Sequence, residues 1–169
     1  MKKSILETER LRLRPFTLAD TKFIIELVNT PGWLEYIGDR NIKTDEQAKE
    51  YLLNGPLKSY ELNGYGLSMV EMKNERTAIG MCGIIKRELL ENPDIGFALL
   101  PAYFGKGYAF EIVSAMMNFA KNNLKLSPIY AITLPNNISS IKLLEKIGLK
   151  YNKTFCFPGE EEELLLYSN

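Results

Sequence analysis

The stretch Ile-Gly-Phe-Ala-Leu-Leu-Pro-Ala-Tyr-Phe-Gly-Lys-Gly-Tyr-Ala, residues 95–109, decides the fold. It begins within an apolar run, Asp94–Leu100, that predicts a strand, and it leads into a helical pattern that extends to about Asn123. Gly105 and Gly107 allow a tight turn that exposes several main-chain N–H groups at the start of this helix. Such a turn is suited to bind an anion, and Lys106 adds positive charge at its rim.

The residues around this turn exclude the two common nucleotide-binding motifs. A Walker A loop requires Gly where Leu100 stands and a hydroxyl residue where Gly107 stands. A dinucleotide fingerprint requires Gly or Ala at the sixth position, which is Phe110, and it normally lies in the first strand–helix–strand unit. Two interpretations remain from the turn alone: a site for a different phosphate-bearing ligand, or a glycine-rich helix start that binds nothing.

After this stretch, periodicity and turn residues predict a strand, a helix that Gly148 ends, and two final strands. Their ranges are Ile129–Leu134, Asn137–Ile147, Tyr151–Phe157 and Leu164–Ser168. Ligands of such strand–helix sheets bind at the carboxyl ends of the strands. The second half of the chain is therefore where the site is expected.

Before this stretch, the pattern predicts a strand and two helices, followed by an antiparallel meander of three strands. The strand Arg10–Phe16 alternates apolar and basic residues, as a half-buried strand does. Thr17 and Asp20 open the first helix, Thr44 caps the second, and the segment between them, Trp33–Lys43, is expected to be irregular. The second helix is Asp45–Leu53, ended by Asn54-Gly55-Pro56, and the meander is Tyr65–Met72, Thr77–Lys86 and Asp94–Leu100.

Composition predicts one soluble domain, residues 1–169, because this length suits a single core. With 21 basic and 21 acidic side chains the net charge is zero, so neither nucleic acid nor an anionic membrane is an expected partner. No apolar window approaches the roughly 18–20 residues of a membrane span, and Met1–Phe16 lacks the apolar stretch of a signal peptide. The cytoplasm is the expected location.

Histidine is absent from the sequence. Catalytic arrangements that pair Ser or Cys with His are therefore excluded, and so are metal sites built on imidazole. The two cysteines, Cys82 and Cys156, are too few for a disulfide framework or a four-ligand zinc site. Proton transfer near neutral pH has to use carboxylates, Tyr, Lys, Cys, Ser or water.

Four segments together resemble the GNAT superfamily of N-acetyltransferases, and most of all its branch of ribosomal-protein N-terminal acetyltransferases. They are Glu9–Pro15, Tyr36–Arg40, Ile95–Pro101 with Phe104–Ala109, and Asn137–Leu149, in the family's order and spacing. The resemblance implies an α/β (α+β) fold in a single domain. Its central sheet would be mixed and mostly antiparallel, with about seven strands, a splay between the fourth and fifth, and helices on both faces.

The resemblance also implies acetyl-coenzyme A as a co-substrate that is bound without a metal. The family pattern Arg/Gln-x-x-Gly-x-Gly/Ala falls on Phe104, Gly107 and Ala109, and Phe104 departs from it. The N–H groups from Gly105 to Ala109 would hold the pyrophosphate, and the strand that ends at Leu99 would pair with the pantetheine arm. The residues implied to contact the coenzyme are Ala98, Leu99, Phe104, Gly105, Lys106, Gly107, Tyr108, Ala109, Asn137 and Ser140.

Attack of an amine on a thioester needs a neutral amine, a stabilised oxyanion and a proton for the leaving thiolate. The resemblance implies the N–H of Leu99 as the oxyanion donor. The family's Tyr acid is replaced by Leu144, so Ser140 is the first expected proton donor and water the second; a capping hydroxyl explains Ser140 equally well. Asp94 is the expected base. The alternative interpretation, that Asp94 is only a solvated carboxylate at the end of a strand, stays open.

Two further catalytic alternatives stay open. Glu88 and Glu91 precede Asp94 in the same loop and could replace it as the base. An acetyl-cysteine route through Cys82 or Cys156 is disfavoured, because a cysteine in an apolar strand is usually inert packing.

The acceptor is expected to be a protein N-terminal amine or a small-molecule amine, and the residues do not choose between them. By resemblance, Trp33, Tyr36, Asp39 and Arg40 wall the acceptor pocket, although aromatic residues there also suit a core edge. The run 160–163, four glutamates, could attract a cationic amine or be a solvated hairpin tip. The rival function, suggested by the missing Tyr, is a non-catalytic acyl-coenzyme A sensor; monomer and homodimer are equally compatible with the sequence.

Overall fold

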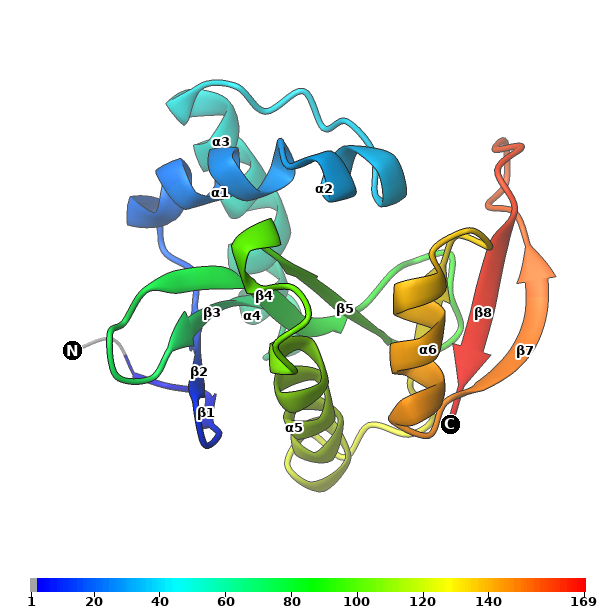
Figure 1. The fold of residues 1–169 in the computed structure, drawn as a ribbon. Coiled ribbons are helices and arrows are strands. Elements are labelled where there is room, and N and C mark those ends of the chain that lie inside the picture. Colours follow the sequence, from blue (N-terminus) through cyan, green and yellow to red (C-terminus); the bar gives the residue numbers. More distant parts are fainter. Residues whose placement is uncertain (1–2) are drawn as a thin grey trace.

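The computed structural model describes residues 3–169, which form one open eight-stranded sheet with helices on both faces (Figure 1). The strand order is β1-β2-β3-β4-β5-β6-β8-β7, and every neighbouring pair is antiparallel except β5 and β6. The strands are β1 (Leu6–Glu7), β2 (Leu11–Pro15), β3 (Leu67–Met72), β4 (Ala78–Ile85), β5 (Asp94–Leu99), β6 (Tyr130–Thr133), β7 (Lys150–Phe155) and β8 (Leu164–Ser168). The helices are α1 (Thr21–Val28), α2 (Pro31–Tyr36), α3 (Asp45–Leu52), α4 (Lys58–Asn63), α5 (Tyr108–Asn122) and α6 (Ile138–Lys146), with 3₁₀ turns at Leu18–Asp20 and Pro101–Tyr103.

The sheet opens between β5 and β6. These parallel strands are joined by a single bridge, Asp94 to Tyr130, supported by the Tyr130 N–H that donates to the Pro93 carbonyl at 2.8 Å. Beyond this bridge the strands diverge toward their carboxyl ends. Apart from the two-residue β1, they are the fourth and fifth strands of the sheet, so the predicted splay is confirmed.

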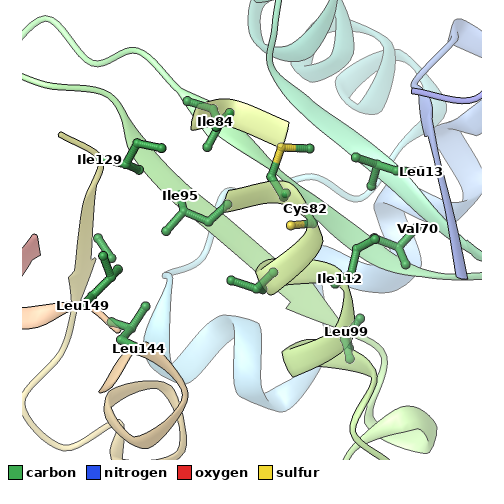
Figure 2. Packing of buried hydrophobic residues seen from close by; sticks show 14 of the residues in the cluster. Leu13, Val70, Cys82, Ile84, Ile95, Leu99, Ile112, Ile129, Leu144 and Leu149 are labelled. Atoms are coloured by element: carbon green, nitrogen blue, oxygen red, sulfur yellow. The ribbon is translucent and has the colours of Figure 1, made fainter. Parts of the chain in front are cut away.

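Strand alternation divides the core between the two faces of the sheet. Val70 and Cys82 pack with α5 in one cluster, which Figure 2 shows from close by. Their neighbours Met69 and Met81 point to the opposite face, where α1 and α3 cover them. Because successive strand residues face opposite sides, strands buried on both faces read as continuous apolar runs, as β4 does.

Strand β2 is more buried than its alternation predicts. Arg12 and Arg14 are each only 6% exposed, so the expectation of a half-buried strand is wrong. Arg14 pairs with Glu71 of β3 at 2.6 Å and with Asp20 at 2.9 Å, and Arg12 lies 3.2 Å from Glu71. Charges can be buried in this way because each guanidinium has a carboxylate partner.

Two local expectations are also corrected. The segment expected to be irregular starts as helix α2, because Pro31 at its first helical position has a fixed φ that suits a helix start. The chain does not stop at Asn54-Gly55-Pro56 but continues through a π-helical turn, Leu53–Leu57, into α4. The wider turn accommodates Pro56, which has no N–H to donate, and Gly64 in a left-handed conformation ends the helix instead. Strand β1 was not predicted from the sequence, because its two residues are too few to show an alternation of apolar and polar side chains.

Among residues 3–169, no helix is both long and apolar enough to cross a membrane.

Candidate active site

A cleft of about 1120 Å³ follows the opening between β5 and β6. It brings together most of the site residues predicted from the sequence, although these come from four separate segments of the chain. Those that line it are Trp33, Tyr36, Arg40, Asp94, Ala98, Leu99, Phe104, Gly105, Gly107, Tyr108, Ala109, Asn137 and Ser140. Asp39 and Lys106 are outside the lining: Asp39 accepts a hydrogen bond from the Asn41 N–H at 2.8 Å, and the Lys106 ammonium lies 5.7 Å from the centre of the Tyr103 ring.

The turn before α5 presents a row of main-chain N–H groups. Gly105 and Gly107 have φ values of 70° and 81°, in the left-handed region that favours glycine. Within the described chain, the N–H groups of residues 105–110 have no hydrogen-bond acceptor, because the first one used at this helix start is that of Glu111, bonded to the Gly107 carbonyl at 3.0 Å. Unpaired N–H groups at a helix N-terminus, with the helix dipole behind them, are a site for a phosphate or another anion.

Arg10 contacts this turn on the side away from the cleft lining and hydrogen-bonds to its main chain. Its guanidinium donates to the Lys106 carbonyl at 3.0 Å, pairs with Glu111 at 2.7 Å and lies 4.4 Å from the centre of the Tyr108 ring. Burial raises the pKa of Glu111, but hydrogen bonds from Thr8 and Arg10 outweigh it and lower the pKa overall. Glu111 therefore stays ionised, and it ties the start of α5 to the chain before β2. The sequence did not predict that Arg10 contacts the turn before α5. The one signal for this contact was Glu111, an acidic residue in the first turn of α5.

Strand β5 offers an unpaired main-chain edge to the cleft. The Leu100 N–H donates to the Ile79 carbonyl of β4 at 2.8 Å, and alternate residues of a strand point their N–H groups to the same side. The N–H and carbonyl groups of Phe97 and Leu99 therefore point away from β4, toward the gap in front of β6. Phe97 shares this geometry with Leu99, and the sequence reasoning missed it.

The start of α6 forms another part of the wall. The side-chain oxygen of Asn137 accepts a hydrogen bond from the Ser140 N–H at 3.2 Å and so caps the helix. Ser140 lines the cleft one turn before Leu143. Leu144, at the position where the resemblance implies a Tyr, is 1% exposed and belongs to the core cluster beneath α6 (Figure 2). The side chain of α6 that faces the cleft at this level is Leu143.

Asp94 lies at the closed end of the opening. Burial raises the pKa of its carboxyl group, and the Arg87 guanidinium at 2.9 Å opposes that effect. Five residues of extended strand, at about 3.3 Å each, separate it by roughly 17 Å from Leu99. Asp94 and the Leu99 N–H therefore cannot act directly on the same small reacting group.

The opposite walls of the cleft, away from the turn, come from segments that are distant in sequence. Trp33 and Tyr36 of α2, and Arg40 in the loop that follows, form one wall together with Tyr51 of α3. The hairpin between β7 and β8 forms the other wall with Phe157, Glu160 and Glu162. Glu161 and Glu163 alternate with these glutamates and are outside the lining. The sequence reasoning missed Tyr51 and Phe157, because neither lies in a recognisable motif.

The cysteines lie outside the cleft. Cys82 is completely buried in the core, and burial raises the pKa of its thiol, so the unreactive thiol form is favoured. Cys156 is exposed near the β7–β8 hairpin, with its sulfur 3.8 Å from the Glu161 carbonyl oxygen. In the part of the chain that the structure describes, no three Cys, Asp or Glu side chains gather into a group able to hold a metal ion.

Comparisons with known proteins agree with this geometry. The model of the acetyltransferase (GNAT) domain matches residues 10–150. The protein YkkB of Bacillus subtilis is 31% identical over 158 residues, covering 90% of this chain and 88% of the relative. The N-acetyltransferase YoaA of the same organism is 28% identical and covers 86% and 82% of the two chains. An acetyltransferase structure from Agrobacterium tumefaciens superposes with a TM-score of 0.82 at 25% identity, covering 100% of this chain and 96% of the other.

Two more distant structures share the fold and have different acceptors in their names. The ribosomal-protein-S5-alanine acetyltransferase of Vibrio fischeri has a TM-score of 0.73 at 22% identity and covers 97% and 94% of the two chains. A variant of the spermidine N-acetyltransferase SpeG of Vibrio cholerae also has a TM-score of 0.73, at 20% identity, with 96% and 94% covered.

Proposed function

The chain belongs to the GNAT acetyltransferase family and is an N-acetyltransferase, and we propose that it moves the acetyl group of acetyl-coenzyme A directly to a primary amine. Both substrates would occupy the one cleft at the same time. Direct transfer is favoured over a covalent enzyme intermediate because neither cysteine lines the cleft and no histidine exists to activate a nucleophile.

The residues present fit coenzyme A. The row of unpaired N–H groups from Gly105 to Ala109 matches the oxygens of a pyrophosphate, and it binds them without a metal. The free main-chain edge of Phe97 and Leu99 matches the amide groups of an extended arm, which would add to the sheet as a strand does. This pair of matched features is the observation that carries the proposal.

Bound acetyl-coenzyme A supplies an activated acetyl thioester, and the protein has to stabilise charge and move protons around it. The N–H of Leu99 or of Phe97 donates to the thioester oxygen as negative charge develops there; one such donor contributes about 3 kcal/mol in other enzymes. The Ser140 hydroxyl at the cleft wall passes a proton to the departing sulfur while it accepts the proton that the attacking amine nitrogen loses, so the serine ends the step neutral. Because a thiol has a pKa of about 8.5, this donor contributes less than the oxyanion contact.

The base in this proposal is on the β7–β8 hairpin. Glu160 and Glu162 line the cleft, whereas Asp94 is paired with Arg87 at the far end of β5. Either hairpin carboxylate can accept a proton from a cationic amine, directly or through one water. The same negative charges attract that amine into the cleft.

The acceptor is a primary amine of a small molecule or of a protein N-terminus. The two distant neighbours named above, one for a ribosomal-protein alanine and one for spermidine, have in common only an amine. A non-catalytic sensor would need no proton acceptor opposite the coenzyme. The two hairpin glutamates that line the cleft, Glu160 and Glu162, therefore favour an enzyme over a sensor.

The proposal is tested by incubating the protein with acetyl-coenzyme A and a panel of primary amines. Release of free thiol and formation of the N-acetyl product should rise together in equal amounts. Coenzyme A binding without acetyl consumption across the whole panel would instead support the sensor. Tight binding of ATP or NAD in preference to coenzyme A would overturn the assignment of the turn.

A further inference from the structure

The acceptor half of the cleft has charges of opposite sign on its two walls. Arg40 lines one wall, and no carboxylate of the described chain lies within 4 Å of it. Glu160 and Glu162 line the other wall, and neither has an ion-pair partner among residues 3–169. The second arginine of the cleft, Arg87, is already paired with Asp94 at 2.9 Å. Arg40 is thus the cleft-lining guanidinium that is left to bind a substrate.

Trp33 adds an unused hydrogen-bond donor beside Arg40. Its side chain lines the cleft and is 5% exposed, and its indole N–H is buried without a hydrogen-bond partner in residues 3–169. Buried donors are usually paired, and an unpaired one at a binding site is satisfied when a ligand supplies the acceptor. An indole N–H only donates, so its partner has to be an oxygen or another electron-pair donor of the substrate.

These donors require a substrate with two different ends. A substrate amine would interact with the glutamates on one wall only. Arg40 and Trp33 on the other wall are hydrogen-bond donors, so they can bind only an oxygen or another acceptor of the substrate. We propose that the acceptor is an α-amino acid or the N-terminal residue of a peptide, whose carboxylate or carbonyl oxygen is held by Arg40 and Trp33 while its amine faces Glu160 and Glu162. This inference rests on the acetyltransferase function proposed above and specifies its acceptor.

The same geometry disfavours polyamines. A polyamine carries positive charge along its length, so it would bring a like charge to Arg40, and it would leave the Trp33 N–H without an acceptor. A site built with a buried donor discriminates strongly against a ligand that lacks the matching group. Tyr36 and Tyr51 on one wall and Phe157 on the other supply aromatic surface, which suits an apolar side chain on the acceptor.

Matched acceptors test this inference directly. Leucine, leucinamide, the dipeptide Leu-Gly and isoamylamine share one apolar side chain, and isoamylamine lacks the oxygen. We expect kcat/KM for at least one oxygen-bearing acceptor to exceed that for isoamylamine and spermidine by about tenfold or more, as for one charge-assisted hydrogen bond. A preference for leucine indicates a free amino acid, and a preference for leucinamide and Leu-Gly indicates a peptide N-terminus.

Two substitutions assign the preference to its residues. Arg40→Gln removes the positive charge of the guanidinium and should reduce the preference for leucine over isoamylamine to within about threefold. Trp33→Phe removes the indole N–H and should lower kcat/KM for the oxygen-bearing acceptors several-fold. Both substitutions keep most of the side-chain volume. Arg76→Gln, an arginine outside the cleft, is the matched control and should keep the preference. Coenzyme A affinity, measured by calorimetry, should be the same in all of these proteins.

Trp33 also reports binding without turnover, because it is the single tryptophan of the chain. Its fluorescence should change on titration with the preferred oxygen-bearing acceptor at lower concentration than with isoamylamine. Faster turnover of spermidine or isoamylamine, or an unchanged preference in Arg40→Gln, would overturn this inference and leave the acetyltransferase function in place. No turnover with any amine would overturn the proposed function, and this inference with it.

Discussion

The two halves of the cleft are built in different ways. The half that we propose for the coenzyme presents main-chain groups of residues close in sequence, from Phe97 on β5 to Ala109 at the start of α5. The acceptor half uses side chains from α2, from the loop after it and from the β7–β8 hairpin, which is more than 100 residues away. A main-chain site depends on conformation and tolerates changes in most side chains, whereas a side-chain site changes with each substitution. The coenzyme half can therefore be shared by relatives whose acceptors differ.

The largest effect is expected from Gly107→Glu. The new side chain disfavours the left-handed φ of 81° that aims the N–H groups, places its Cβ 3.3 Å from the Arg10 guanidinium and puts a carboxylate where the phosphates bind. Backbone strain of about 1–2 kcal/mol and like-charge repulsion act together. Calorimetric titration should show coenzyme A affinity lowered by about 100-fold or more.

Gly64→Glu is the matched control for that change. Gly64 also has a left-handed φ, of 77°, and a Cβ there would meet no atom within 4 Å, but it ends α4 outside the cleft. Its coenzyme A affinity should equal that of the wild type, although some stability is lost. Equal losses of affinity in both variants would mean that backbone strain, and not the site, explains the effect.

The next effect should appear on the acceptor side only. Replacing both Glu160 and Glu162 by Gln removes the proposed base, and kcat/KM for the amine should fall by about 100-fold, within the range for general-base catalysis. Coenzyme A affinity should not change. The matched control replaces Glu161 and Glu163 by Gln, which removes the same charge from the same hairpin but outside the cleft. Similar losses in both double variants would show that the hairpin acts only through its net charge.

A smaller effect separates the core face of α6 from its cleft face. Leu144→Tyr places a phenol in the tightly packed core and should lower the free energy of unfolding by about 1–3 kcal/mol in urea denaturation. Leu143→Tyr places the same phenol in the cleft and should leave stability nearly unchanged. If Leu144→Tyr were as stable as wild type and more active, this position would face the coenzyme as the family's Tyr does.

The smallest kinetic effect is expected for Asp94→Asn. If Asp94 only pairs with Arg87, kcat should change by less than about threefold, against a loss of about 100-fold or more for a direct base. Because burial raises the pKa of Asp94 in the folded state, the wild type binds this proton more tightly when folded. Its stability should therefore fall as pH rises through the interval between the unfolded and folded pKa values, and thermal denaturation of the Asn variant should lack this step.

The contrast between the two halves also explains what the sequence could predict. The glycine turn, the strand before it and the capped helix Ile138–Lys146 were predictable because each depends on local backbone conformation. The hairpin wall with Phe157 was not, because nothing in residues 157–162 indicates that they lie opposite α2. Leu99 was expected as the oxyanion donor from the resemblance and Asp94 as the base from its place at the start of the same strand, but about five residues of extended strand separate them. The burial of Arg12 and Arg14 could not be predicted, because it depends on ion pairs with Glu71 and Asp20. The alternation of residues along one strand does not reveal such partners.

The central claim, that coenzyme A is held by main-chain N–H groups, is tested most directly by amide NMR of the ¹⁵N-labelled protein during titration with coenzyme A. At 19.3 kDa the chain suits this measurement. The largest shifts should be those of Gly105 to Ala109, followed by Phe97 and Leu99, because these N–H groups gain an acceptor on binding. Coenzyme A binding that leaves these amides unshifted, while amides elsewhere move, would contradict the account.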